Sequence, residues 1–129
     1  MRFTLIDEVL ESTPERIVAV KNVTAAEEYL GDHFPGFPVL PGVFMVEAMV
    51  QAARRLLRER GRSRTVLSGV RALRYGSFVR PGESLRVEVV LDRGGDGGEV
   101  RFKGVGSVVR PDGSSETAVS GRFTMRDRR

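Results

Sequence analysis

The stretch DHFPGFPVLPGVFMVEAMVQAA, residues 32–53, decides the fold of this chain. Its first part, HFPGFPVLPG, contains three prolines and two glycines. Such a density excludes regular helix and central strand, so we predict an ordered loop. From Val43 to about Arg60 the residues are good helix formers, and the first two turns are apolar almost all round. This pattern predicts one buried helix, which emerges into solvent as it becomes arginine-rich and ends near Gly61.

The rest of the sequence predicts β-structure around that helix. Residues 16–23 are short and β-branched, and residues 85–92 alternate apolar and polar side chains with a period of two. GGDGG at 94–98 and PDGSS at 111–115 are typical of hairpin turns, and a last strand is expected to run to about Met125. We therefore predict a single α+β domain, residues 1–129, with one long central helix and an antiparallel sheet of about five to six strands.

Composition narrows the chemistry that is available to the chain. There is no cysteine, which excludes disulfides, thiolate metal sites and cysteine nucleophiles, and His33 is the one histidine. The net charge of +4 would suit an acidic carrier protein or the phosphates of coenzyme A, and no nucleic-acid motif is present. The opening MRFTLIDEVLE lacks the pattern of a signal peptide, and no apolar run is long enough for a membrane span. We expect a cytoplasmic protein without nucleic-acid partner or membrane insertion.

Three features of the central stretch could serve acid–base chemistry. His33 opens the rigid loop and would be a base near neutral pH. Glu47 lies one turn inside the helix among apolar residues, where burial would favour the protonated form that a general acid needs. Gly42 stands at the start of the helix, where free backbone N–H groups can stabilise an oxyanion. The residues alone leave bland roles open, because such a histidine is often a structural hydrogen-bonding group and such a glutamate is often half exposed.

The same stretch resembles the signature of the β-hydroxyacyl-acyl-carrier-protein dehydratases of fatty acid synthesis. The resemblance includes the spacing of fourteen residues between His33 and Glu47, and it extends more weakly over most of the chain. The matching positions are His33, Phe34, Pro35, Gly36, Pro38, Pro41, Gly42, Glu47, Ala48, Gln51 and Ala52.

That family implies a hot-dog fold, in which a curled sheet wraps the central helix. It also implies a homodimer, or a trimer of dimers, with His33 of one chain facing Glu47 of the other. His33 would remove the α-proton of an acyl thioester bound to carrier protein or coenzyme A, Glu47 would protonate the departing hydroxyl, and the Gly42 amide would hold the carbonyl. No metal or organic cofactor is implied. The residues expected along the acyl tunnel or its loop are Phe37, Val39, Leu40 and Gln51.

Several alternatives stay open at this point. A glutamate at position 47 favours a plain dehydratase, because the related dehydratase-isomerases resemble this pattern but have aspartate there. A hot-dog acyl thioesterase, a coenzyme A-linked hydratase and a non-catalytic acyl-binding homologue are the other candidates. Presence of both His33 and Glu47 argues against the non-catalytic one.

Overall fold

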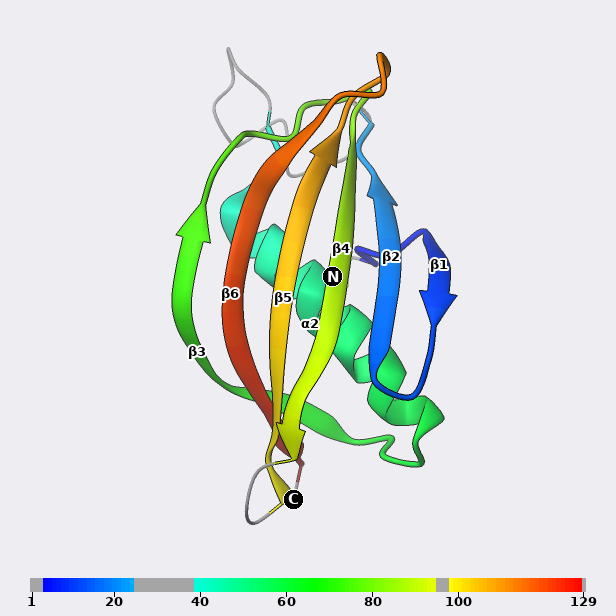
Figure 1. Ribbon diagram of the computed structural model, residues 1–129, viewed down its shortest axis with the longest axis vertical. Coiled ribbons are helices and arrows are strands. Elements are labelled where there is room, and N and C mark those ends of the chain that lie inside the picture. The colour runs from blue at the N-terminus through cyan, green and yellow to red at the C-terminus, as the bar shows by residue number, and fades with distance from the viewer. Residues whose placement is uncertain (1–3, 25–38, 95–97, 129) are drawn as a thin grey trace.

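The computed structural model describes residues 4–24, 39–94 and 98–128, and within them it shows one helix and six strands (Figure 1). His33 and Phe37 therefore lie outside the described residues. The elements, in chain order, are β1 (Glu8–Ser12), β2 (Arg16–Asn22), α2 (Gly42–Glu59), β3 (Thr65–Tyr75), β4 (Ser84–Gly94), β5 (Val100–Val109) and β6 (Ser115–Asp127).

The six strands form one antiparallel sheet in the order β1-β2-β4-β5-β6-β3, which curls around α2 (Figure 1). Strand β4 follows the predicted alternation, and β5 alternates in the same way. Leu85, Val87 and Val89 face the helix and are at most 1% exposed, while Arg86 and Glu88 point away from it. This arrangement confirms the predicted central helix and antiparallel sheet.

Helix α2 begins and ends close to the predicted residues. Past its C-terminus Gly61 takes a positive φ of 86°, and the N–H of Arg62 reaches back to the carbonyl of Leu57 over 2.8 Å. A positive φ is a conformation that glycine adopts without steric cost, so Gly61 stops the helix. The prediction that the first two turns are buried all round is wrong, because Val43 is 67% exposed and Phe44 is only partly covered.

Strand β3 occupies an edge of the sheet and is paired on one side only, with β6. Two register shifts interrupt this pairing, and within the second of them, between Arg71 and Arg74, Ala72 takes a φ of 53°. Four large apolar side chains of the strand lie on the helix side of the sheet, and each of these four is at least 38% exposed. They are Leu67, Val70, Leu73 and Tyr75. The edge of β3 therefore combines unpaired backbone groups with exposed apolar side chains.

Candidate active site

Glu47 lies in the second turn of α2 and is partly exposed, not buried as the sequence suggested. Glu47 lies on the same side of α2 as Val43, which is 67% exposed, so this side of the helix faces outward. The side-chain amide of Gln51, one turn further on, donates a hydrogen bond to Oε1 of Glu47 over 3.5 Å. The Oε1 atom of Gln51 accepts a hydrogen bond of 2.8 Å from the N–H of Leu5, a residue that is 1% exposed. Gln51 thus connects the carboxyl group to a fixed point of the core.

The N-terminus of α2 presents its backbone N–H groups without a side-chain cap. Pro41 is the N-cap residue, and its carbonyl accepts from Phe44 and Met45. Within the described part of the chain no side chain caps the helix, and its first turn contains no acidic residue. The amide of Gly42 therefore has the position and the polarity that favour a developing negative charge.

The ring of Tyr75, from the end of β3, packs directly against Gly42. A Cβ atom placed on Gly42 would lie 2.7 Å from Cε1 and 2.9 Å from Cζ of Tyr75. Only a residue without a side chain allows this approach. Tyr75 is 53% exposed and Phe78, three residues further on, is 50% exposed, so aromatic surface is accessible to solvent here.

Val39 and Leu40 lead from the proline-rich loop into the helix, and both are 1% exposed. The N–H of Leu40 donates to the carbonyl of Val79 over 2.8 Å, which attaches this end of the loop to the connection between β3 and β4. Val79 is fully buried, so the approach to α2 is held at a fixed place. Buried side chains at these two positions are compatible with a tunnel wall inside the core.

The β3–β4 connection is in turn fixed to the β5–β6 hairpin by a polar network. Ser77 Oγ donates to the Glu116 carboxylate, and Arg110 contacts Glu116 at 3.3 Å and Glu83 at 3.4 Å. The hydrogen bond from Ser77, followed by the bond and charge of Arg110, lowers the pKa of Glu116 from the ordinary glutamate value. A chain of contacts therefore links this hairpin to the residues that enter the site.

Neither a metal site nor a membrane-spanning helix is found in the described part of the chain. In the described residues, no group of three or more His, Asp or Glu side chains is arranged to hold a metal ion. The described ranges also contain no helix with the length and apolar character of a membrane span.

A shallow depression of about 220 Å³ lies on the sheet face that points away from α2, so it is separate from Glu47. It is lined by Val18, Arg86, Glu88, Val105, Ser107, Val109 and Ser115.

Of the residues predicted from the sequence, the structure places Gly42, Glu47 and Gln51 along one helix, with Val39 and Leu40 at its entry. His33 and Phe37 lie outside the described residues. Tyr75 and the backbone of Leu5 were not predicted as site residues from the sequence. No local pattern could have identified them, because each meets α2 only through the folding of the sheet.

Comparisons with known proteins agree with the fold. A family model described as ApeI-like, ApeI dehydratase, matches residues 9–113. The 3-hydroxyacyl-[acyl-carrier-protein] dehydratase FabZ of Bacillus cereus (strain AH820) is 44% identical over 95 residues, which cover 70% of this chain and 66% of that protein. The protein of the same name from Anoxybacillus flavithermus is 39% identical over 106 residues, covering 79% of this chain and 69% of the relative.

Among solved structures, the dehydratase heterocomplex ApeI:P from Xenorhabdus doucetiae superposes with a TM-score of 0.69. The match covers 97% of this chain and 99% of the other at 16% identity, so it supports the fold alone. The aligned region spans 66% of the Bacillus cereus relative, about two thirds of its length. Together with the central helix and the curled antiparallel sheet, these matches show that the chain belongs to the hot-dog family of FabZ-type 3-hydroxyacyl-[acyl-carrier-protein] dehydratases.

Proposed function

We propose that this protein dehydrates β-hydroxyacyl thioesters to trans-2-enoyl thioesters, with the acyl group bound to a carrier protein or to coenzyme A. The observation that carries the proposal is the position of Glu47 one turn and a half from the uncapped N-terminus of α2, in a member of a dehydratase family. One rigid helix then holds both a proton donor and a backbone N–H that can donate a hydrogen bond to an oxyanion, which suits a reaction that develops negative charge on a carbonyl oxygen while a hydroxyl leaves as water.

The proposed chemistry divides between three groups. His33 takes the proton from the α-carbon, and the electron pair of that C–H bond forms the new double bond. The Gly42 amide stabilises the negative charge that gathers on the thioester oxygen. Glu47 gives its proton to the β-hydroxyl as the C–O bond breaks, so that water leaves. His33 returns its proton to Glu47 through solvent before the next turnover, and no other reactant is needed.

Gln51 supports this role of Glu47 by position. Its amide contacts the carboxyl group at 3.5 Å while its carbonyl oxygen is held by the backbone of Leu5. A carboxyl group with one fixed neighbour keeps a narrow range of orientations. We propose that Gln51 orients Glu47, and that Val39, Leu40 and Phe37 border the acyl chain.

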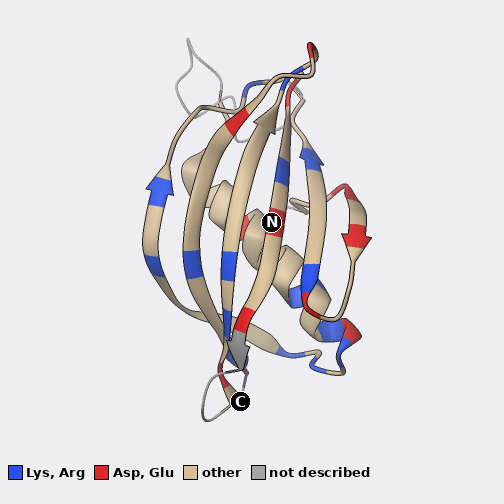
Figure 2. Cartoon of the chain, viewed as in Figure 1, with Lys and Arg blue, Asp and Glu red and all other residues tan. Residues whose placement is uncertain are grey.

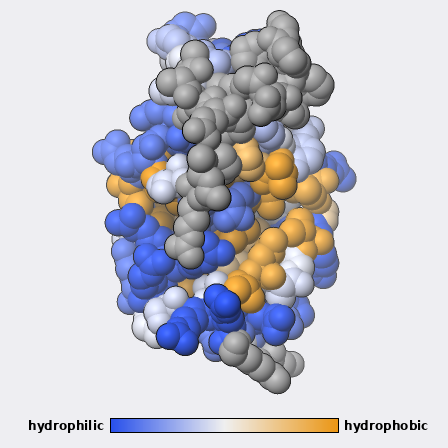
Figure 3. All heavy atoms as spheres, turned by 180° about the vertical axis from the view of Figure 1, so that it is seen from behind, coloured by the Kyte–Doolittle hydropathy of each residue, from blue (hydrophilic) through white to orange (hydrophobic). Residues whose placement is uncertain are grey.

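We propose further that the chain forms a single domain, that it works in the cytoplasm and that two copies of it pair through β3. The strand leaves one edge unpaired and exposes its apolar inner face, and Figure 3, which views the helix side, shows hydrophobic residues gathered there. A second copy of β3 would continue the sheet and cover Val70 and Leu73. We propose that each site of such a pair combines Glu47 of one copy with His33 of the other.

Hydration of a short trans-2-enoyl thioester, followed by the loss of conjugated-thioester absorbance, tests the reaction. Both the carrier-bound and the coenzyme A-bound substrates should turn over. His33→Ala should abolish turnover and Glu47→Gln should remove most of it, while Glu59→Gln, the same change at the far end of α2, should have little effect. Near-normal rates in either site variant would refute the assigned roles. Release of free thiol without hydration would indicate a thioesterase instead.

Mixing the two inactive variants tests the shared site. After subunit exchange, half of the dimers are hybrids and each hybrid has one intact site, so about a quarter of the wild-type activity should return. No recovery after exchange has been verified would exclude a site built from both chains.

A further inference from the structure

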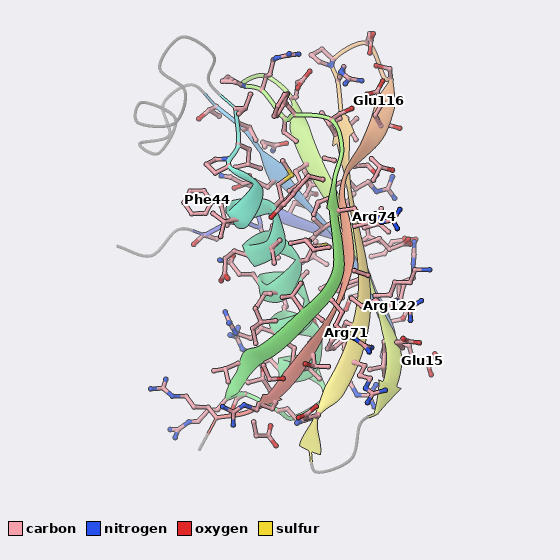
Figure 4. The ribbon with its side chains drawn as sticks, turned by 90° about the vertical axis from the view of Figure 1, so that its left-hand side faces the viewer. Glu15, Phe44, Arg71, Arg74, Glu116 and Arg122 are labelled. Atoms are coloured by element: carbon pink, nitrogen blue, oxygen red, sulfur yellow. The ribbon has the colours of Figure 1, made fainter. Side chains whose placement is uncertain are left out.

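Three positive side chains stand in line across neighbouring strands of the sheet. Arg71 of β3 is directly opposite Arg122 of β6, and Arg122 is directly opposite Lys103 of β5. All three are exposed on the face that points away from α2. Figure 4 shows Arg71 and Arg122, with Arg74 beside them, directed away from the helix. Figure 2 shows the same positive band across these strands. We call these three residues the cationic row.

Like charges directly opposite each other destabilise a sheet, so the presence of three such charges in the cationic row suggests a role other than stability. Little within the chain neutralises it. Strands β3 and β5 contain no acidic residue, and β6 has acidic residues only at its two ends, Glu116 and Asp127. Asp92 of β4 accepts a hydrogen bond from Arg122 at 3.2 Å. Among the described residues, Arg71 and Lys103 have no acidic partner.

The dimensions of the row match a particular kind of partner. Adjacent strands are about 4.8 Å apart, so the three charges repeat at about that distance across the sheet. Carboxylates at positions i, i+4 and i+7 of an α-helix repeat at about 5–6 Å along one side. We propose that the cationic row is the docking surface for an acidic α-helix of a protein partner, lying across β3, β6 and β5. Arg74 and Arg101, exposed on the same face, flank the row and would widen its field.

Nucleic acid fits this surface less well. Three charges within about 10 Å could neutralise only a few phosphates, and the affinity of a protein for DNA depends largely on how many phosphates it neutralises. The row also lies on the opposite side of the sheet from Glu47 and Gly42. Docking there would leave the proposed active site free, so the inference does not depend on the proposed function.

A binding measurement with a defined probe tests the inference. The probe is a fluorescein-labelled alanine-based helical peptide with glutamates at i, i+4 and i+7, and its control carries glutamines at those positions. The variant Arg71→Gln/Lys103→Gln/Arg122→Gln should lose about tenfold or more in affinity, a difference well outside measurement error. The control Arg55→Gln/Arg58→Gln/Arg128→Gln removes the same charge from exposed positions elsewhere and should bind as the wild type does.

Binding should weaken as salt rises, because exposed charges are screened. The row variant should be at least as heat-stable as the wild type, since it removes repulsion, and so misfolding is separable from lost binding. Equal loss in the two triple variants, equal binding of the glutamine peptide, or tighter row-dependent binding of duplex DNA would each overturn the proposal. Turnover of coenzyme A-bound and carrier-bound substrate should be unchanged in the row variant. A loss with carrier-bound substrate alone would mean that the row receives the substrate carrier and not a separate partner.

Discussion

Replacing Gly42 with alanine would test whether the contact with Tyr75 shapes the active site. The substitution keeps the backbone N–H that we assign to the oxyanion, and Gly42 is not among the glycines with positive φ, so alanine can adopt the backbone conformation. The added Cβ would lie 2.7 Å from Cε1 of Tyr75. Ordinary contact between carbon atoms needs about 3.5 Å, so the ring must move by about 0.8 Å.

The cost should fall on turnover more than on stability. Alanine is favoured over glycine inside a helix by about 1 kcal/mol, and a forced overlap costs about 1–3 kcal/mol. Because Tyr75 is 53% exposed, its ring can turn away, and the free energy of unfolding should fall by about 2 kcal/mol at most. A displacement of this size beside the reacting carbonyl can cost about a hundredfold in rate. We therefore expect kcat of enoyl thioester hydration to fall while the circular dichroism spectrum stays unchanged.

The matched variant is Tyr75→Leu, which removes Cε1 and Cζ and leaves Cδ1, the ring atom that is 3.3 Å from the added Cβ. Introduced into Gly42→Ala, it should restore part of the lost turnover, whereas the same change in the wild type should lower turnover slightly. Wild-type kcat in Gly42→Ala would refute the importance of the contact. A double variant as inactive as Gly42→Ala would show that the loss has another cause than the Tyr75 ring.

Two further predictions concern stability. Because the folded state lowers the pKa of Glu116, the contribution of this carboxylate is present above the ordinary glutamate value of about 4.3 and is lost as the pH falls below it. The urea midpoints of wild type and Glu116→Gln should therefore differ at neutral pH and converge in acid, and a constant difference would contradict the network with Ser77 and Arg110. A Cβ on Gly104 would lie 2.6 Å from Sδ of Met49, so Gly104→Ala should destabilise the protein by about 1–3 kcal/mol, measured by urea denaturation. The cost should shrink in a Met49→Ala background, and equal cost in both backgrounds would show that the two positions are not coupled.

The central helix was predictable because its signals are local. The Pro41–Gly42 pair starts it, helix formers follow, and Gly61 ends it, so the predicted range of about Val43 to Arg60 and the observed Gly42–Glu59 differ by one residue at each end. Strands β4 and β5 were predictable for the same reason. A strand that is buried on one face alone has apolar residues at every second position.

The sequence of β3 does not show the period of two that is typical of a strand, because its pairing with β6 is irregular. Leu67, Val70 and Leu73 all face the helix side although they are three residues apart, a spacing that is typical of a helix. The register shifts after Leu67 and after Arg71 each add a residue to the strand, so that the next apolar side chain again points to the helix side. They also break the alternation of apolar and polar residues along the sequence. The contact of Tyr75 with Gly42 depends on this same strand, and therefore no pattern in the sequence could reveal it.

The partial exposure of Glu47 leads to a last prediction, on how the activity depends on protein concentration. Glu47 is partly exposed, and the apolar face of β3 has no cover within the described residues. If association through β3 completes the site, the specific activity must fall when dilution separates the chains, and Val70→Lys must lower activity and particle mass together because it places a charge on the joined face. Lys103→Gln, a change on the opposite face, should alter neither. A dilution series of turnover, compared with light scattering, decides the point: constant specific activity in a range where the protein is monomeric would mean that one chain carries the whole site.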